Sequence, residues 1–158
     1  MTFRQLALSL LVVGWIAPAL AAGSSSSSSS STQSSSSTDF DRAVTAVNNG
    51  NFTTALTLLN KVVAKDPGNA DAWNYIGFSR RNLKQFDQAL AAYDKALSID
   101  PNHRGANEYL GELYLKTGKL DKAKERLAKL DKLCLLGCDE YDDLAKAIKA
   151  FETTGNSG

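Results

Sequence analysis

The sequence is poor in the residues that catalytic and metal sites most often need. It has one histidine, His103, and two cysteines, Cys134 and Cys138, among 158 residues. A hydrolytic triad or a zinc site has little to be built from with a single histidine. No glycine-rich phosphate loop and no paired-carboxylate motif stands out. We therefore predict no catalytic residues and expect neither a metal ion nor a cofactor.

An excess of charge of either sign is also absent. The chain has 18 basic and 17 acidic residues, and both counts are 17 once Arg4 in the N-terminal segment is set aside. A nucleic acid or an anionic membrane surface would favour a clear positive excess. The balance of charge therefore gives no support for either as a partner.

A continuous apolar run is present only near the N-terminus, where Arg4 precedes an apolar stretch over residues 6–16. This order is typical of a secretory signal peptide, and the stretch is shorter than the roughly 20 residues of a membrane-spanning helix, the alternative interpretation. Ala19 and Ala21 supply the small residues that a signal peptidase accepts. We expect residues 1–21 to be removed and the mature protein to be periplasmic or secreted, without membrane insertion.

A tract that is almost entirely serine follows the apolar stretch. It has no apolar surface to bury, so nothing offsets the entropy lost on ordering it. We expect residues 22–38 to form a disordered linker and the similarly polar residues 152–158 to form a flexible tail. Residues 39–151 remain, which is one domain by length.

The sequence matches itself at a spacing of 34 residues, which predicts three structural repeats at about residues 36–69, 70–103 and 104–137. The middle unit shows the pattern best, with Trp73, Ile76, Gly77, Ala89, Tyr93, Ala96 and Pro101. Small residues from two successive helices let their backbones approach, while the large residues fill the space beside them. No unit buries its apolar face alone, so the three are expected to stack.

The positions of proline and glycine within each unit predict a pair of helices. Pro67 and Pro101 end the second helix of a unit, because proline has no amide donor with which to continue. Gly50 and Gly118 fall where the chain turns inside a unit. A last helix over residues 139–151 has no partner and is expected to cap the stack, which gives seven helices in all.

This pattern resembles the tetratricopeptide-repeat family, and together with the N-terminal segment it resembles exported bacterial members of that family. The resemblance implies an all-α, helix-turn-helix repeat solenoid with three tetratricopeptide repeats and a C-terminal capping helix. In this family the first helix of each unit lines a concave groove for a partner. The matching positions here are Asn74, Phe78, Arg81, Asn82, Glu108, Glu112 and Lys116, with Phe40, Val44, Val47 and Asn48 in the first unit. Phe78 and Val44 have an alternative role as packing between repeats.

Family members that clamp the C-terminal carboxylate of a peptide do so with Lys, Asn and Arg at set positions. Asn74 matches one of them. Phe40 and Val44 stand where the first Lys and Asn belong, and Gly105 and Tyr109 stand where the last Lys and Arg belong. This carboxylate clamp is therefore expected to be absent.

The two cysteines flank three residues at the joint between the third repeat and the last helix. In an exported protein such a pair favours a structural disulfide between Cys134 and Cys138. The alternative is a redox-active pair, although such a pair normally has two residues between the cysteines instead of three. His103 lies in an inter-repeat turn and is expected to be a solvated loop residue.

Taken with the resemblance, these features predict a non-enzymatic interaction module, a scaffold or adaptor of the bacterial envelope or secreted space. Its partner would be a protein or peptide bound in the groove. The alternative is a structural or self-assembling subunit of an envelope complex that binds no peptide.

Overall fold

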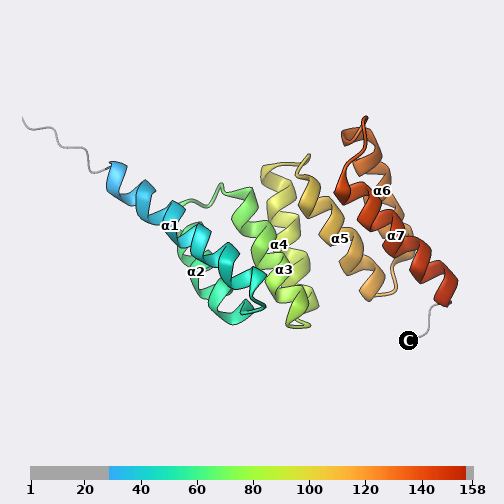
Figure 1. Cartoon of the computed structure of the whole chain (residues 1–158), viewed down its shortest axis with the longest axis horizontal. Helices are drawn as coiled ribbons and strands as arrows, with labels where there is room; N and C mark the ends of the chain where they lie inside the picture. Colours follow the sequence, from blue (N-terminus) through green and yellow to red (C-terminus); the bar gives the residue numbers. More distant parts are fainter. Residues whose placement is uncertain (1–28, 156–158) are drawn as a thin grey trace, which may run out of the picture.

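A computed structural model describes residues 29–155, and Figure 1 shows them as a row of helices joined by short turns. The helices are α1 (Ser29–Asn48), α2 (Phe52–Lys65), α3 (Ala70–Asn82), α4 (Phe86–Ile99), α5 (Arg104–Lys116), α6 (Leu120–Leu133) and α7 (Asp139–Thr154). The all-α prediction with seven helices is confirmed for this part of the chain. The proposed signal peptide lies outside the described residues.

Consecutive helices pack as three hairpins, and the hairpins stack side by side. α1 packs on α2, α3 on α4 and α5 on α6, and each first helix also contacts the neighbouring repeat (Figure 1). α7 packs against both α5 and α6 at one end of the row. The predicted repeat solenoid with a C-terminal capping helix is confirmed.

The turn inside each repeat has the same hydrogen-bond pattern. Gly50 and Gly118 both have φ of 71°, and Lys84, at the equivalent position of the middle repeat, has φ of 60°. In the middle repeat the Lys84 amide donates to the Arg81 carbonyl at 3.0 Å, and the Gln85 amide donates to the Arg80 carbonyl at 2.9 Å. These two bonds define a Schellman motif. Glycine suits its left-handed residue, so Lys84 is strained where its two counterparts are not.

Two helix boundaries differ from the sequence-based prediction. Residues 22–38 were expected to be a disordered linker, yet α1 begins at Ser29. Once packing fixes the later turns of a helix, each added residue costs little, and serine is only a moderately poor helix former. α7 likewise continues to Thr154 instead of ending at residue 151, so the predicted tail is partly helical.

Two glycines let large side chains reach the backbone. A Cβ atom on Gly77 would lie 2.5 Å from a ring carbon of Tyr93 in α4. A Cβ atom on Gly111, at the same position of the next repeat, would lie 2.5 Å from Leu144 of α7. Tyr93 and Leu144 are fully buried. The capping helix therefore inserts Leu144 against Gly111 of α5.

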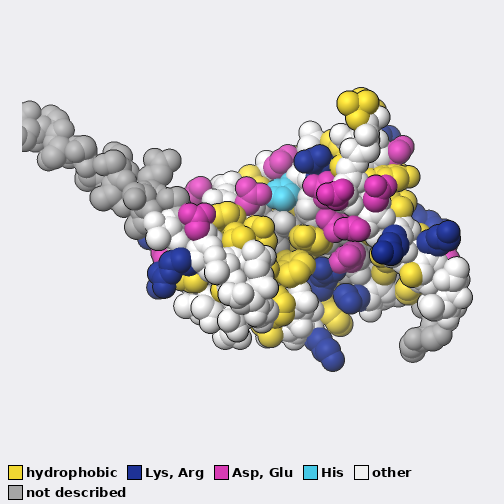
Figure 2. All heavy atoms as spheres, viewed as in Figure 1, with side chains coloured by type: hydrophobic (Ala, Val, Ile, Leu, Met, Phe, Trp, Pro, Cys, Tyr) yellow, Lys and Arg dark blue, Asp and Glu magenta, His cyan; other side chains and the backbone are white. Residues whose placement is uncertain are grey.

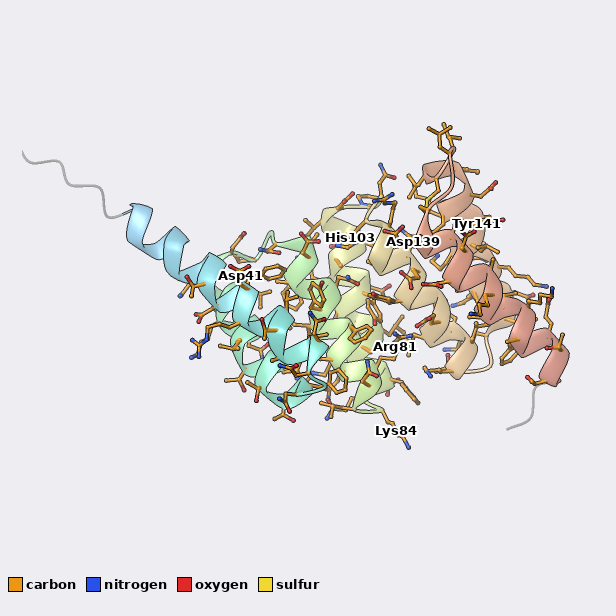
Figure 3. All side chains as sticks on the ribbon, in the orientation of Figure 1. Asp41, Arg81, Lys84, His103, Asp139 and Tyr141 are labelled. Atoms are coloured by element: carbon orange, nitrogen blue, oxygen red, sulfur yellow. A yellow bond between two sulfur atoms is a disulfide. The ribbon has the colours of Figure 1, made fainter. Side chains whose placement is uncertain are left out.

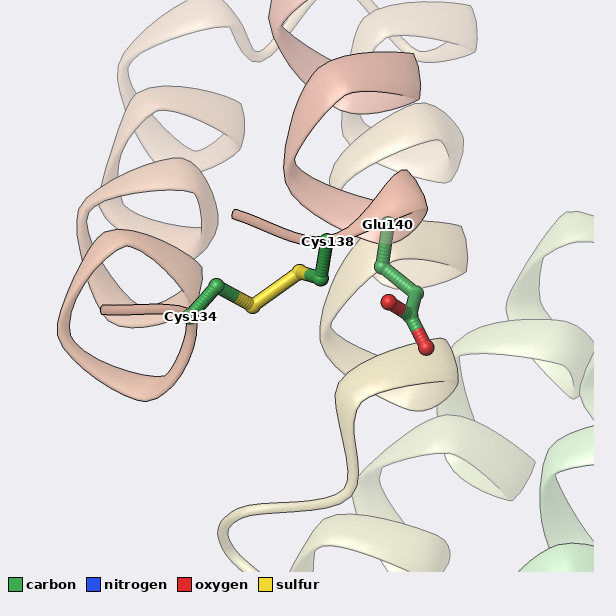
Figure 4. A group of neighbouring side chains, drawn as sticks. All are labelled: Cys134, Cys138 and Glu140. Carbon is green, nitrogen blue, oxygen red and sulfur yellow. A yellow bond between two sulfur atoms is a disulfide. The ribbon is translucent and has the colours of Figure 1, made fainter. Parts of the chain in front are cut away.

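Further contacts hold the capping helix in place. The predicted disulfide joins Cys134 to Cys138 and closes a five-residue loop between α6 and α7 (Figure 4). The Lys124 ammonium on α6 lies 2.6 Å from the Glu152 carboxylate on α7. The chain entropy removed by so short a loop corresponds to about 2 kcal/mol, so the bond restrains α7 more than it holds the whole fold.

Candidate peptide-binding groove

The first helices of the three repeats and the capping helix lie along one face of the molecule. We call this surface, formed by α1, α3, α5 and α7, the first-helix face; it is turned toward the viewer in Figures 1 and 2. Figure 2 shows apolar side chains gathered over its middle and acidic side chains over α5 and α7. Of the residues predicted to line the groove, seven lie on α3 and α5, and those of the first unit, Phe40, Val44, Val47 and Asn48, lie on α1.

The structure places the seven predicted groove residues at very different depths. Asn74, Arg81 and Glu108 are buried, with exposed fractions of 5%, 7% and 7%. Phe78 and Glu112 are half-buried, whereas Asn82 and Lys116 are exposed. The Asn82 side chain donates to the Phe78 carbonyl at 2.8 Å within its own helix. Contact of any of the seven with a partner stays a prediction.

Aromatic rings run across the apolar part of the first-helix face. The centroids of Phe40 and Tyr75 are 5.8 Å apart, and Phe78 lies 6.1 Å from Phe52 and 5.0 Å from Tyr109. Edge-on and tilted pairs at these distances are favourable. Phe78 therefore packs between neighbouring repeats, as the alternative interpretation expected, while its ring keeps part of its surface open.

Arg81 ties α3 to α5. Its guanidinium forms an ion pair with the Glu112 carboxylate and lies 5.2 Å from the ring centroid of Phe78 and 5.3 Å from that of Tyr109. The Arg81 side chain is 6% exposed. A buried, paired guanidinium between two rings is held by electrostatic attraction from three sides. The same charge works against the rise in the pKa of the buried Tyr93 phenol.

Glu108 is the buried carboxylate of this face. Its pKa is raised from an ordinary 4.5 to about 7, chiefly by burial and then by the negative charges of Asp143 and Glu140 on α7, against the opposing effect of Arg81. Among the described residues no hydrogen bond reaches this carboxylate. A carboxyl group that is costly to ionise and lacks a donor is therefore present between α5 and α7.

Asn74 is a second buried group with an unmet hydrogen-bonding need. Its Oδ1 atom accepts no hydrogen bond within the described part of the chain. Its amide nitrogen lies beside Gly105, where an added Cβ would come within 3.3 Å. Gly105 and Glu108 are three residues apart in α5 and so share a side of that helix. Asn74 thus contacts α5 one turn before Glu108.

His103 has a role that the sequence analysis missed. It is the N-cap of α5, where its Nδ1 atom accepts from the Ala106 amide at 3.1 Å, and its Nε2 atom lies 3.0 Å from Asp71 Oδ1. Its side chain is 12% exposed, so the predicted solvated loop residue is wrong. Figure 3 places His103 beside the starts of α3 and α5. The repeat alignment could have indicated this capping role, because Asn69, at the equivalent position one repeat earlier, caps α3 in the same way.

The cysteine pair also lies near a carboxylate. Cys134, Cys138 and Glu140 bring their ligand-type atoms within 4.8 Å of one another (Figure 4). The two sulfurs are bonded to each other, so neither is the thiolate that a metal ion needs. The group therefore has a structural role in this state.

Comparison with known proteins identifies the repeats. Models of the tetratricopeptide repeat match residues 70–103 and residues 92–125. Residues 70–125 thus match the tetratricopeptide repeat. Those models do not reach α1, α2 and α7, which continue the same stack of helices.

Curated relatives share only a small part of their length with this chain. Tetratricopeptide repeat protein 37 of Xenopus laevis is 37% identical over 76 residues, which are 48% of this chain and 5% of that protein. Human Superkiller complex protein 3 is 33% identical over 90 residues, or 57% of this chain and 6% of that protein. The chain therefore spans about one twentieth of the length of these relatives.

Solved tetratricopeptide-repeat domains have the same fold. The first such domain of Spaghetti (RPAP3), bound to the HSP90 peptide SRMEEVD, superposes with a TM-score of 0.66 at 18% identity and covers 75% of this chain and 94% of that one. The Arabidopsis OM64 domain gives 0.68 at 15% identity and covers 75% and 98%. At these identities the likeness establishes the fold.

Within the described residues, no helix has the length and apolar character needed to cross a membrane.

Proposed function

We propose that the tetratricopeptide repeats form a scaffold or adaptor module that binds a segment of another protein on the first-helix face. The observation that carries this proposal is the set of partly open rings of Tyr75, Phe78 and Tyr109 beside buried polar groups that lack partners. A mixed surface of this kind suits an apolar anchor together with directed hydrogen bonds. The peptide-bound state of the similar Spaghetti domain supports the same use of the fold.

The partner is expected to differ from the peptides held by the similar domains. The peptide in the Spaghetti complex and the HSP70 peptide SGPTIEEVD in the second human RPAP3 domain both end in Glu-Glu-Val-Asp. At the positions where the resemblance places the basic residues of the carboxylate clamp, this chain has Phe40, Gly105 and Tyr109. An acidic C-terminal tail would therefore meet rings and carboxylates.

We further propose that the protein is exported by a bacterium and works in the periplasm or outside the cell. The sequence order around Arg4 and Ala21 supports export, and the bond between Cys134 and Cys138 suits an oxidising compartment. Edman sequencing and a thiol count on secreted material test this. An N-terminus at Ala22 and two thiols released only by reductant are expected; an uncleaved chain with two free thiols would contradict the location.

Binding on the first-helix face is tested with two matched tyrosine variants. Tyr75 is half-buried on that face, whereas Tyr114 is half-buried on α5 under Lys122 of α6. Proteins captured from the exported fraction would be identified by mass spectrometry, purified and titrated against Tyr75→Ser and Tyr114→Ser. We expect the affinity to fall at least tenfold for Tyr75→Ser alone. Equal affinities for the two variants would place the partner elsewhere.

A second candidate is a subunit that assembles with copies of itself or inside a larger complex. Leu135 and Leu136, at the tip of the disulfide loop, are 85% and 102% exposed, which is unusual for large apolar residues in a monomer. Light scattering over a hundredfold range of concentration decides this. Concentration-dependent growth that Leu136→Ser abolishes would favour assembly, and a constant monomer mass would reject self-assembly.

A further inference from the structure

Two buried side chains of the first-helix face, Asn74 and Glu108, have acceptor atoms that no donor among the described residues reaches; Arg81 Nε, a donor on the same face, also lacks a partner there. Asn74 Oδ1 is fully buried and has no donor among the described residues. Glu108 is only 7% exposed, and no described side chain or amide donates to its carboxylate, whose oxygens keep a small contact with solvent. A buried acceptor without a donor costs about 1–3 kcal/mol, and more when it is charged. A group that completes the site at Asn74 and Glu108 must therefore supply donors.

Two contacts join α3 to α5, one on each side of Glu108, and neither involves its carboxylate. Asn74 and Arg81 are seven residues apart on α3, and they meet Gly105 and Glu112, which are seven apart on α5. Glu108 lies between these two contacts. The cation nearest to it on α3, Arg81, already forms an ion pair with Glu112. Glu108 therefore feels the charge of Arg81 but forms no ion pair with α3 among the described residues.

The capping helix adds charge of the same sign. Asp143 and Glu140 on α7 act on Glu108 as like charges. Among the described residues, one cation forms an ion pair with Glu140: Arg104, at 3.5 Å, whose side chain is 53% exposed. Figure 2 shows the resulting cluster of acidic side chains over α5 and α7. A buried carboxylate under the influence of two further carboxylates, with its nearby cations already paired to other residues, favours binding of a cation.

We infer that the site between α5 and α7 binds a Lys or Arg side chain of the partner segment, with Glu108 and Asn74 accepting its hydrogen bonds. This inference rests on the proposed function and gives the chemistry of the partner. The rings of Tyr109 and Phe78 lie beside the site and suit an apolar or aromatic residue next to the cation. The charge preference is thus opposite to that expected for a peptide ending in Glu-Glu-Val-Asp.

The charge of the site depends on pH in the range where Glu108 titrates. With its pKa raised to about 7 by burial and by Asp143 and Glu140, against Arg81, Glu108 is mostly protonated at pH 5.5 and mostly ionised at pH 8. A cation binds the ionised form, so the apparent affinity scales with the ionised fraction. We expect binding to strengthen by about thirtyfold between these two pH values.

The test uses fluorescein-labelled octapeptide pools with random sequence except for one central residue, fixed as Arg, Lys, Gln or Glu. Anisotropy titrations with the full chain at pH 8 are expected to give at least tenfold tighter binding for Arg or Lys than for Gln, and none for Glu. Glu108→Gln should remove this preference and the pH dependence. Glu125→Gln, which removes an exposed charge from α6, should leave both unchanged.

The outcomes separate this inference from the proposed function. Binding of all four pools with equal strength, or a preference for Glu, would overturn the cationic partner while leaving a peptide-binding groove. Failure of every pool to bind would overturn both. Circular dichroism on each variant confirms that the helices are retained, so a loss of binding reports on the site.

Discussion

The two ends of the first-helix face are built on the same repeat but differ in chemistry. At the same position of successive first helices stand Phe40, Asn74 and Glu108, so the surface passes from a ring through an amide to a carboxylate. The positions between the helices vary much less, as Gly77 with Ala89 and Gly111 with Ala123 show. Helix packing thus constrains one set of positions, and the other is free to specify a partner.

The largest effect on stability should come from truncating the side chain that packs the capping helix onto α5, at the end of the first-helix face where the acidic residues lie (the acidic end). Leu144 is fully buried against Gly111, so Leu144→Ala is expected to lower the free energy of unfolding by about 2–5 kcal/mol. Hydrogen exchange should show lost protection in α7 and α5, with α1 and α2 little changed, because repeats contact only their neighbours. Uniform loss along the chain would mean that the two ends fold as one cooperative unit.

A smaller loss of stability is expected from replacing Arg81, which joins α3 to α5. Arg81→Met keeps most of the aliphatic stem but leaves Glu112 without its partner and removes two ring contacts, so we expect a loss of about 2–4 kcal/mol in urea unfolding. Arg42→Met is the control, because Arg42 is 67% exposed and its ion pair at 3.6 Å contributes little. Equal effects for both variants would show that Arg81 does not tie α3 to α5.

Glu108 should make the acidic end, and not the aromatic end, sensitive to pH. Its folded pKa of about 7 lies above the ordinary 4.5, so the folded protein binds more protons between these values and stability falls as pH rises through that window. Glu108→Gln should therefore stabilise the protein by about 1–2 kcal/mol at pH 8 and by little at pH 4. Thermal unfolding at both pH values measures this, and equal shifts would refute the titration.

The smallest effect on stability is expected from substitutions in the turns inside the repeats, which have the same backbone conformation at both ends of the molecule. Lys84 has the positive φ that glycine adopts at the matching positions, so Lys84→Gly is expected to stabilise by about 0.5–1 kcal/mol. Gly118→Ala, the matched change in the opposite sense, should destabilise by a similar amount. Melting temperatures that move in the same direction for both variants would contradict the role of this φ angle.

Local patterns in the sequence were enough to predict most of the fold. The spacing of Gly50, Gly118 and Pro101 marked the turns and helix ends, because each of these residues acts on its own stretch of backbone. Lys84 escaped notice as a left-handed residue, since only its register with the two glycines indicates the conformation. The expected linker over residues 22–38 did not include a helix, whereas α1 begins at Ser29, because composition measures the preference of a segment but not the helix already formed beyond it.

The candidate site was predicted less completely. The seven groove positions followed from the family resemblance, but their depths did not, since burial of Glu108 and Arg81 depends on how α3, α5 and α7 meet. The opposing effects of Asp143 and Arg81 on Glu108 come from residues far apart in the chain. Such charges can be summed only once the helices are placed.

The shared turns also allow the distance between the two ends to change without a change in their chemistry. The links after α2 and α4 use the same bonds: the Asp66 carboxylate accepts from the Gly68 amide at 3.1 Å, and that of Asp100 accepts from the Asn102 amide at 2.9 Å. A duplicated copy of residues 70–103 would find matching joints on both sides. It would place Glu108 one repeat further from Phe40, so the distance between the two ends of this surface can be lengthened in whole repeats.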